Sequence, residues 1–197
     1  MNFVLASNSP RRHQLLTQFD LNLIIASHTF DENSISKNEN PEEYCKLIAK
    51  GKAMSLCDNY PDHSVLSADT IVVIDDIILE KPIDRDDAIR MLNLLSAREH
   101  KVITAVSLFY KNKNINFSFI EKTIVTFNSL SKEEIFYYID KYKPYDKSGA
   151  YGIQDFSSIF VKSINGCYFN VMGLPLSTLF QYLKKFDLVQ FPFNTGN

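Results

Sequence analysis

The 197-residue sequence predicts an α/β protein with a central mixed β-sheet flanked by helices. In its first half, short apolar runs alternate with segments of helical periodicity, as in parallel strands joined by helices. In its second half, two long strand-like segments, 100–110 and 116–127, are joined by a short polar turn and predict an antiparallel hairpin. Together these two patterns indicate a sheet of mixed direction.

The first elements follow from local sequence signals. Residues 2–6 are an apolar run bounded by polar residues, which predicts a buried strand. Ser9 is a good helix N-cap, and Pro10 suits the first position of a helix that we expect to reach Phe19. The other elements expected in this half are a strand at 21–26, a helix at 41–57 and a strand-like run at 64–75, extended by 77–79.

The second half is read in the same way. Apolar residues spaced for one face predict a helix over 86–95, and the capping box Ser131-Lys-Glu-Glu134 starts another that ends near Tyr142. The remaining predictions are a strand at 158–164, a turn at 165–166 and a last helix that ends near 186. We therefore expect a single domain over 1–186 and a loose tail over 187–197.

Composition excludes several classes of function. A net charge of −2 provides no basic field for duplex nucleic acid. No signal peptide is recognisable, and no apolar stretch is long enough to cross a membrane. The three cysteines are far apart and odd in number, which argues against a zinc site or a disulfide framework and favours a reducing cytoplasm.

The segment that follows the first strand indicates an anion site. Arg11 and Arg12 lie in the first turn of the predicted helix, where the helix dipole already carries positive charge. Two guanidinium groups beside unsatisfied backbone N–H groups are suited to bind an anion. The alternative is a solvated helix start from which both side chains point away.

Four further residues suggest chemistry. Asp69 interrupts an apolar run, where a carboxylate is costly unless it is paired, bound to metal or shifted in pKa. It is either a general base or metal ligand at a strand end, or the cap of a turn between two shorter strands. Lys52 and Lys81 are ambiguous alone, and Glu32 is either a Mg²⁺ ligand or part of an exposed acidic loop.

Familiar nucleotide and hydrolase motifs are absent from the sequence. It contains no P-loop, no G-x-G-x-x-G and no G-x-S-x-G, so neither a dinucleotide site nor a hydrolytic serine triad is indicated. The four histidines are scattered without the spacing of metal ligands.

Five stretches in order resemble the Maf family, also called septum formation inhibitor Maf. They span nearly the whole chain, and although each alone is weak, the five in sequence are highly specific. They are Ala6-Ser-Asn-Ser-Pro-Arg-Arg12, Ser67-Ala-Asp-Thr70, Lys81-Pro82, Asp146-Lys-Ser-Gly-Ala-Tyr-Gly-Ile-Gln154 and Asn170-Val-Met-Gly-Leu-Pro-Leu176.

This resemblance implies a fold related to the inosine triphosphate pyrophosphatases, with two lobes around a cleft. It also implies an enzyme that hydrolyses a nucleoside triphosphate to the monophosphate and pyrophosphate with a divalent cation, Mg²⁺ or Mn²⁺. Asp69 would accept the proton, and Arg12, Thr70 and Gln154 match the subgroup that acts on dTTP and UTP. The residues that would hold the triphosphate are Ser7, Arg11, Arg12, Lys52 and Lys81.

The amide of Gln154 suits such a substrate, because it can both donate to and accept from a pyrimidine edge. The resemblance also implies a homodimer. Two other functions stay open: a non-catalytic nucleotide-binding regulator of septum formation, and a 7-methyl-GTP pyrophosphatase. Asp69 favours a catalytic function over the non-catalytic regulator, and Thr70 and Gln154 argue against the 7-methyl-GTP pyrophosphatase. Three small residues depart from the family pattern, Ala97 and Ala105 in place of Gly and Ser148 in place of Ala.

Overall fold

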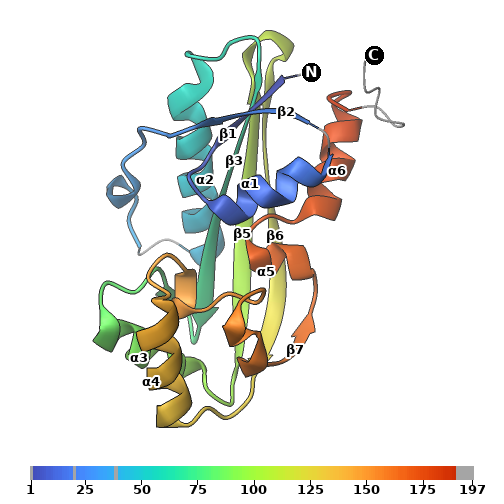
Figure 1. Cartoon of the computed structure of the whole chain (residues 1–197). Coiled ribbons are helices and arrows are strands. Elements are labelled where there is room, and N and C mark those ends of the chain that lie inside the picture. Colours follow the sequence, from blue (N-terminus) through green and yellow to red (C-terminus); the bar gives the residue numbers. More distant parts are fainter. Residues whose placement is uncertain (1, 20, 38–39, 190–197) are drawn as a thin grey trace. The chain divides into compact units, whose positions relative to one another are not determined.

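The computed structural model describes residues 2–19, 21–37 and 40–189, which form a mixed sheet with helices around it (Figure 1). The strands follow the order β2-β1-β3-β5-β6-β7, and β4 pairs with β3. Both pairings of β1 are parallel, whereas β4 and β7 pair antiparallel with their neighbours. The predicted α/β fold with a mixed sheet is therefore confirmed.

The elements agree closely with the predicted ranges. The strands are β1 (Asn2–Ala6), β2 (Asn22–Ala26), β3 (Ser64–Ile74), β4 (Ile77–Leu79), β5 (Glu99–Tyr110), β6 (Ile115–Phe127) and β7 (Val161–Asn165). The α-helices are α1 (Pro10–Leu16), α2 (Pro41–Cys57), α3 (Arg85–Leu95), α4 (Lys132–Tyr142), α5 (Tyr168–Met172) and α6 (Leu176–Lys185). The predicted capping box of α4 is present, with Ser131 and Glu134 each bonded to the other's backbone N–H.

Four local predictions need correction. β3 runs through Asp69 without a break, and 77–79 form a separate strand that folds back on β3. Ser9 is the N-cap of α1, but its side chain makes no capping hydrogen bond. The predicted strand at 158–164 begins only at Val161, because Phe156–Phe160 form a 3-10 helix whose two end residues turn toward the core of aromatic rings. The expected last helix is confirmed as α6. A short helix that was not predicted, α5, precedes it and is separated from it by Gly173, with φ of 106°, and Pro175.

The chain folds as two compact units, whose boundaries fall inside β3, β5 and β6 and between α5 and α6. The first unit comprises Met1–Asp69, Thr104–Ile120 and Gly173–Asn197, and the second comprises Thr70–Ile103 and Glu121–Met172. The β1-α1-β2 and β2-α2-β3 crossovers belong to the first unit, and α3, α4 and α5 belong to the second. Of the predicted tail, residues 187–189 are described, and Leu188 is 3% exposed; the remainder, 190–197, lies outside the described residues.

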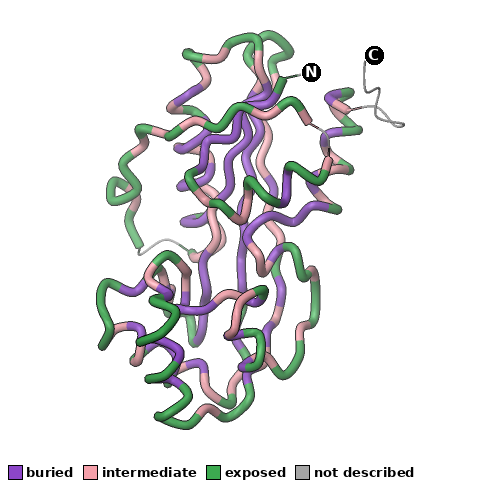
Figure 2. The backbone as a smooth tube through the Cα atoms, viewed as in Figure 1, coloured by how far each residue is buried: buried purple, intermediate pink, exposed green. Residues whose placement is uncertain are grey.

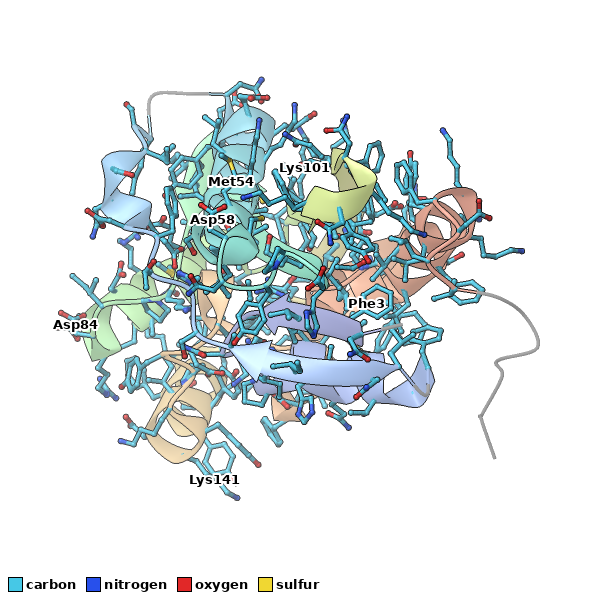
Figure 3. All side chains as sticks on the ribbon, turned by 90° about the horizontal axis from the view of Figure 1, so that it is seen from above. Phe3, Met54, Asp58, Asp84, Lys101 and Lys141 are labelled. Carbon is cyan, nitrogen blue, oxygen red and sulfur yellow. The ribbon has the colours of Figure 1, made fainter. Side chains whose placement is uncertain are left out.

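Each unit has its own apolar core. The central strands are buried over most of their length, and the outer sides of the helices are exposed (Figure 2). In the first unit, Phe3 of β1 is fully buried, whereas Met54 on α2 is exposed (Figure 3). Within the described residues no helix is long and apolar enough to cross a membrane.

The core of the second unit holds a buried histidine. His100 Nε2 lies 2.7 Å from the Tyr151 hydroxyl oxygen, and Phe127 packs edge-on against the imidazole. Nδ1 of His100 has no hydrogen-bond partner among the described residues. Burial lowers the pKa of His100 to about 3, because the protonated ring would have to give up its hydration.

We predict that this histidine makes the protein less stable in acid. Below pH 6.5 the unfolded chain binds a proton at position 100 that the folded chain excludes, so stability falls as the pH decreases toward 3. Between pH 7 and pH 5 this one group should remove about 2 kcal/mol of unfolding free energy. Urea unfolding at several pH values should show a shallower pH slope in His100→Gln. The exposed His13→Gln is the control, and an unchanged slope in His100→Gln would contradict the prediction.

Candidate active site

The ammonium group of Lys52 joins two carboxylates in the first unit. Its Nζ lies 2.7 Å from Asp69 Oδ1 on β3 and 2.9 Å from Glu32 Oε2 in the loop before α2. The side chains of Lys52 and Asp69 are only 8% and 14% exposed, while that of Glu32 is 46% exposed. The costly carboxylate noted in the sequence is therefore paired, and its second oxygen, Oδ2, is not bound to the lysine.

The close approach of the Glu32 loop depends on Gly51. A Cβ atom at Gly51 would lie 2.5 Å from ring carbons of Phe30, so a side chain at this position would displace the ring from its place against α2. Phe30 lies two residues before Glu32, and Asp31 caps the short 3-10 helix Glu32–Ser34 by accepting from the Asn33 N–H. The acidic pair is thus held by local contacts beside α2.

Arg12 lies close to the same carboxylates. Its Nε donates to the carbonyl oxygen of Gly173 at 2.8 Å, and Nη1 lies 3.4 Å from Ser7 Oγ. Ser7 Oγ also accepts from the Ser9 N–H, which shapes the turn that starts α1. Burial lowers the pKa of the Arg12 guanidinium, and the negative charges of Asp69 and Glu32 oppose that shift.

Arg11 is the second cation of this helix turn. It is partly buried, and its positive charge contributes to the lowered pKa of Arg12. Ser7, Arg11, Arg12, Lys52 and Asp69 all belong to the first unit, together with Glu32. Electropositive groups at a helix start beside a paired carboxylate can bind a phosphate chain and activate water.

Two further residues at this site received no role from the sequence. The Cys45 thiol lies 3.3 Å from the Asp69 carbonyl oxygen and 3.9 Å from Oδ2, and burial together with the charge of Asp69 raises its pKa well above the usual range. His28 Nε2 lies 3.7 Å from Glu32 Oε1. Spacing along the chain could not reveal either contact, because neither residue belongs to a recognisable motif.

The other predicted site residues belong to the second unit. Thr70 follows Asp69 in β3, and its carbonyl oxygen accepts from Ser148 Oγ at 2.8 Å. Ser148, one of the departures from the family pattern, thus bonds to the backbone next to Asp69. Lys81 is exposed before the buried Pro82, and Gln154 is exposed on a turn.

Glu32 and Asp69 are two carboxylates of the first unit that could contact a divalent cation, and Lys52 Nζ lies within 2.9 Å of an oxygen of each. No group of three or more His, Cys, Asp or Glu residues that could hold a metal occurs in the part of the chain that the structure describes. Glu32 and Asp69 offer two carboxylates, and Mg²⁺ in nucleotide enzymes commonly takes one or two carboxylates and completes its shell with phosphate oxygens and water.

We predict that Lys52→Met destabilises the fold by about 2 to 4 kcal/mol, because two carboxylates would lose the cation between them. Lys46→Met is the matched control on the same helix, since the ion pair of Lys46 with Glu43 is exposed and 3.4 Å long. The control should change stability by about 0.5 kcal/mol at most. Urea unfolding measures both; equal small effects would show that the buried pairing has no stabilising role.

Known proteins resemble this chain over nearly its full length. A dTTP/UTP pyrophosphatase of Geobacillus sp. (strain WCH70) is 46% identical over 183 residues, covering 92% of this chain and 96% of the relative. A dTTP/UTP pyrophosphatase of Thermosipho africanus (strain TCF52B) is 44% identical over 183 residues, covering 93% and 92%. The solved Ham1 protein of Staphylococcus aureus shares the fold, with a TM-score of 0.54 at 12% identity over 94% of this chain and 99% of that one. The family model for Maf-like proteins matches residues 2–186, and the chain belongs to the Maf family.

Proposed function

We propose that the protein is a nucleoside triphosphate pyrophosphatase that converts dTTP and UTP to their monophosphates and pyrophosphate. The observation that carries this proposal is the paired Asp69, held by Lys52 beside Arg12 in a family whose relatives are named dTTP/UTP pyrophosphatases. A protein that only binds nucleotide needs the cations but has no use for the partly buried carboxylate.

The proposed reaction transfers the α-phosphoryl group to water. Asp69 accepts a proton from the water molecule while the water oxygen forms a bond to the α-phosphorus. The bond between the α-phosphorus and the oxygen that bridges to the β-phosphate breaks, and pyrophosphate leaves. Lys52 binds Oδ1 of Asp69 at 2.7 Å, and we assign the proton to Oδ2, which the Cys45 thiol contacts at 3.9 Å. Catalysis of this kind depends on positioning and on neutralising charge.

The phosphate chain needs several cations, and three of the four proposed ones belong to the first unit. We propose that Arg11, Arg12 and Lys52 contact the phosphates, with the Ser7 hydroxyl as a further hydrogen-bond partner. Ser7 and Lys52 are buried, so their contacts act in a low dielectric, where they are stronger than in water. Lys81 is the fifth residue assigned to the phosphates by the resemblance.

Selectivity for the base is assigned to Arg12, Thr70 and Gln154. The side-chain amide of Gln154 can donate and accept at once, which matches the alternating groups on a pyrimidine edge. A site built to hydrogen-bond one pattern rejects bases that leave its polar groups unpaired. The preference for dTTP and UTP over 7-methyl-GTP rests on these residues.

A divalent cation, Mg²⁺ or Mn²⁺, is part of the proposal, with Glu32 and Asp69 as the residues that would hold it. When bound, it would neutralise phosphate charge and lower the pKa of a coordinated water. We also propose a cytoplasmic location, which the absence of disulfides among Cys45, Cys57 and Cys167 supports. A homodimer stays a prediction, which sedimentation can test.

We predict that purified protein with Mg²⁺ releases pyrophosphate from dTTP and UTP faster than from other nucleoside triphosphates. Asp69→Asn should lower kcat by about 10²- to 10⁴-fold, because the proton acceptor is lost. Asp58→Asn, at the exposed end of α2, is the control and should keep full activity. Turnover confined to 7-methyl-GTP would contradict the assigned selectivity, and nucleotide binding without turnover would support a regulator.

A separate prediction concerns the cation. Dialysis against a chelator should abolish turnover, and added Mg²⁺ or Mn²⁺ should restore it. Glu32→Gln should raise the concentration of Mg²⁺ needed for half-maximal rate, because one of the two carboxylates is then neutral. Full activity in excess chelator would rule out the cation.

A further inference from the structure

Gln154 lies on a tight turn in the second unit. The Asp155 N–H donates to the Gly152 carbonyl oxygen at 3.0 Å, which closes a four-residue turn with Gln154 in its third position. Gln154 is exposed, so the packing of its own side chain does not fix where its amide points. Its direction depends on the backbone that carries it.

A buried hydroxyl holds the first residue of this turn. Ser157, in the 3-10 helix Phe156–Phe160, is 0% exposed. Its Oγ accepts from the Gly152 N–H at 3.0 Å and donates to the Gly152 carbonyl oxygen at 3.0 Å. Both backbone groups of Gly152 are therefore bound by one side chain that has no access to water.

An ion pair holds the last residue of the turn. Lys147 Nζ lies 3.3 Å from Asp155 Oδ2, and the lysine side chain is 14% exposed. The pair passes so close to Gly152 that a Cβ atom there would lie 2.7 Å from Asp155 Oδ2 and 3.0 Å from Lys147 Cε. A side chain at position 152 would therefore displace the ends of the Asp155 and Lys147 side chains.

We propose that Ser157 and the Lys147–Asp155 pair are positioning residues for Gln154 and thereby set the preference of the enzyme for the base. This inference rests on the proposed function, in which Gln154 reads the pyrimidine edge. An exposed amide discriminates between bases only if its direction is fixed before the substrate arrives, because otherwise it turns to suit any edge. The Ser157 hydrogen bonds and the Lys147–Asp155 ion pair fix the backbone from which the Gln154 side chain extends, and so restrict the positions that its amide can reach.

Two matched pairs of variants test the proposal. Ser157→Ala removes both hydrogen bonds to Gly152. The matched control is Ser158→Ala, which changes the adjacent, exposed serine of the same 3-10 helix. Asp155→Asn weakens the ion pair at the turn, whereas Asp140→Asn weakens an exposed ion pair with Arg85 elsewhere in the second unit. Gln154→Ala is the reference variant, in which the proposed contact between the amide and the base is lost completely.

The readout is the ratio of kcat/KM for UTP to that for CTP and GTP, measured together with the melting temperature. We expect Ser157→Ala and Asp155→Asn to lower this ratio about tenfold, toward that of Gln154→Ala. The two control variants should keep the wild-type ratio. A lower melting temperature with an unchanged ratio would show that these contacts have only a structural role and would overturn the inference.

The outcomes separate this inference from the function on which it rests. If the wild-type protein hydrolyses no nucleoside triphosphate, the proposed function fails. If the wild-type enzyme prefers UTP and Gln154→Ala keeps that preference, the proposed enzymatic function is supported, and the positioning role of Ser157 and the Lys147–Asp155 pair is overturned. Loss of preference in Gln154→Ala, Ser157→Ala and Asp155→Asn, but in neither control, is the result that supports it.

Discussion

The ion pairs of Lys52 are the interaction on which the site of the first unit depends. One buried ammonium group connects a helix, a strand and a loop, through contacts of 2.7 Å and 2.9 Å to Asp69 and Glu32. A charge removed from water at this depth is tolerated only with such partners. The absence of a side chain at Gly51 is part of the same arrangement, since it admits Phe30 and the loop that carries Glu32.

The start of α1 has charges that disfavour the helix but suit the binding of an anion. Two arginines at a helix N-terminus oppose the helix dipole, and no acidic residue in the first turn offsets them. Hydrogen bonds from Arg12 to the Gly173 carbonyl oxygen and to Ser7 Oγ offset this cost. The resulting cluster of donors and positive charge suits an anion with several oxygens, as a triphosphate is.

The second unit anchors the turn that carries Gln154. Its core packs His100, Phe127 and Tyr151 edge to face, and burial keeps the histidine neutral at the pH of a cell. From this core the chain passes directly into the turn of Gln154, which Ser157 and the Lys147–Asp155 pair hold at both ends. A turn anchored to a dense aromatic core holds the backbone of an exposed side chain in one place.

The sequence by itself determined the elements of this protein and the identity of its motifs. Helix caps such as the box at Ser131 and Glu134, the alternation of strands with helices, and the cost of Asp69 in an apolar run all act over a few residues and can be read locally. Only the tertiary structure decided which charges meet. Lys52 and Asp69 are 17 residues apart, and Arg12 and Gly173 are 161 apart, so the order of strands in the sheet brings them together. Contacts of Cys45 and His28 with the same carboxylates likewise had no local signal, because a side chain pairs according to its place in space and leaves no spacing in the chain.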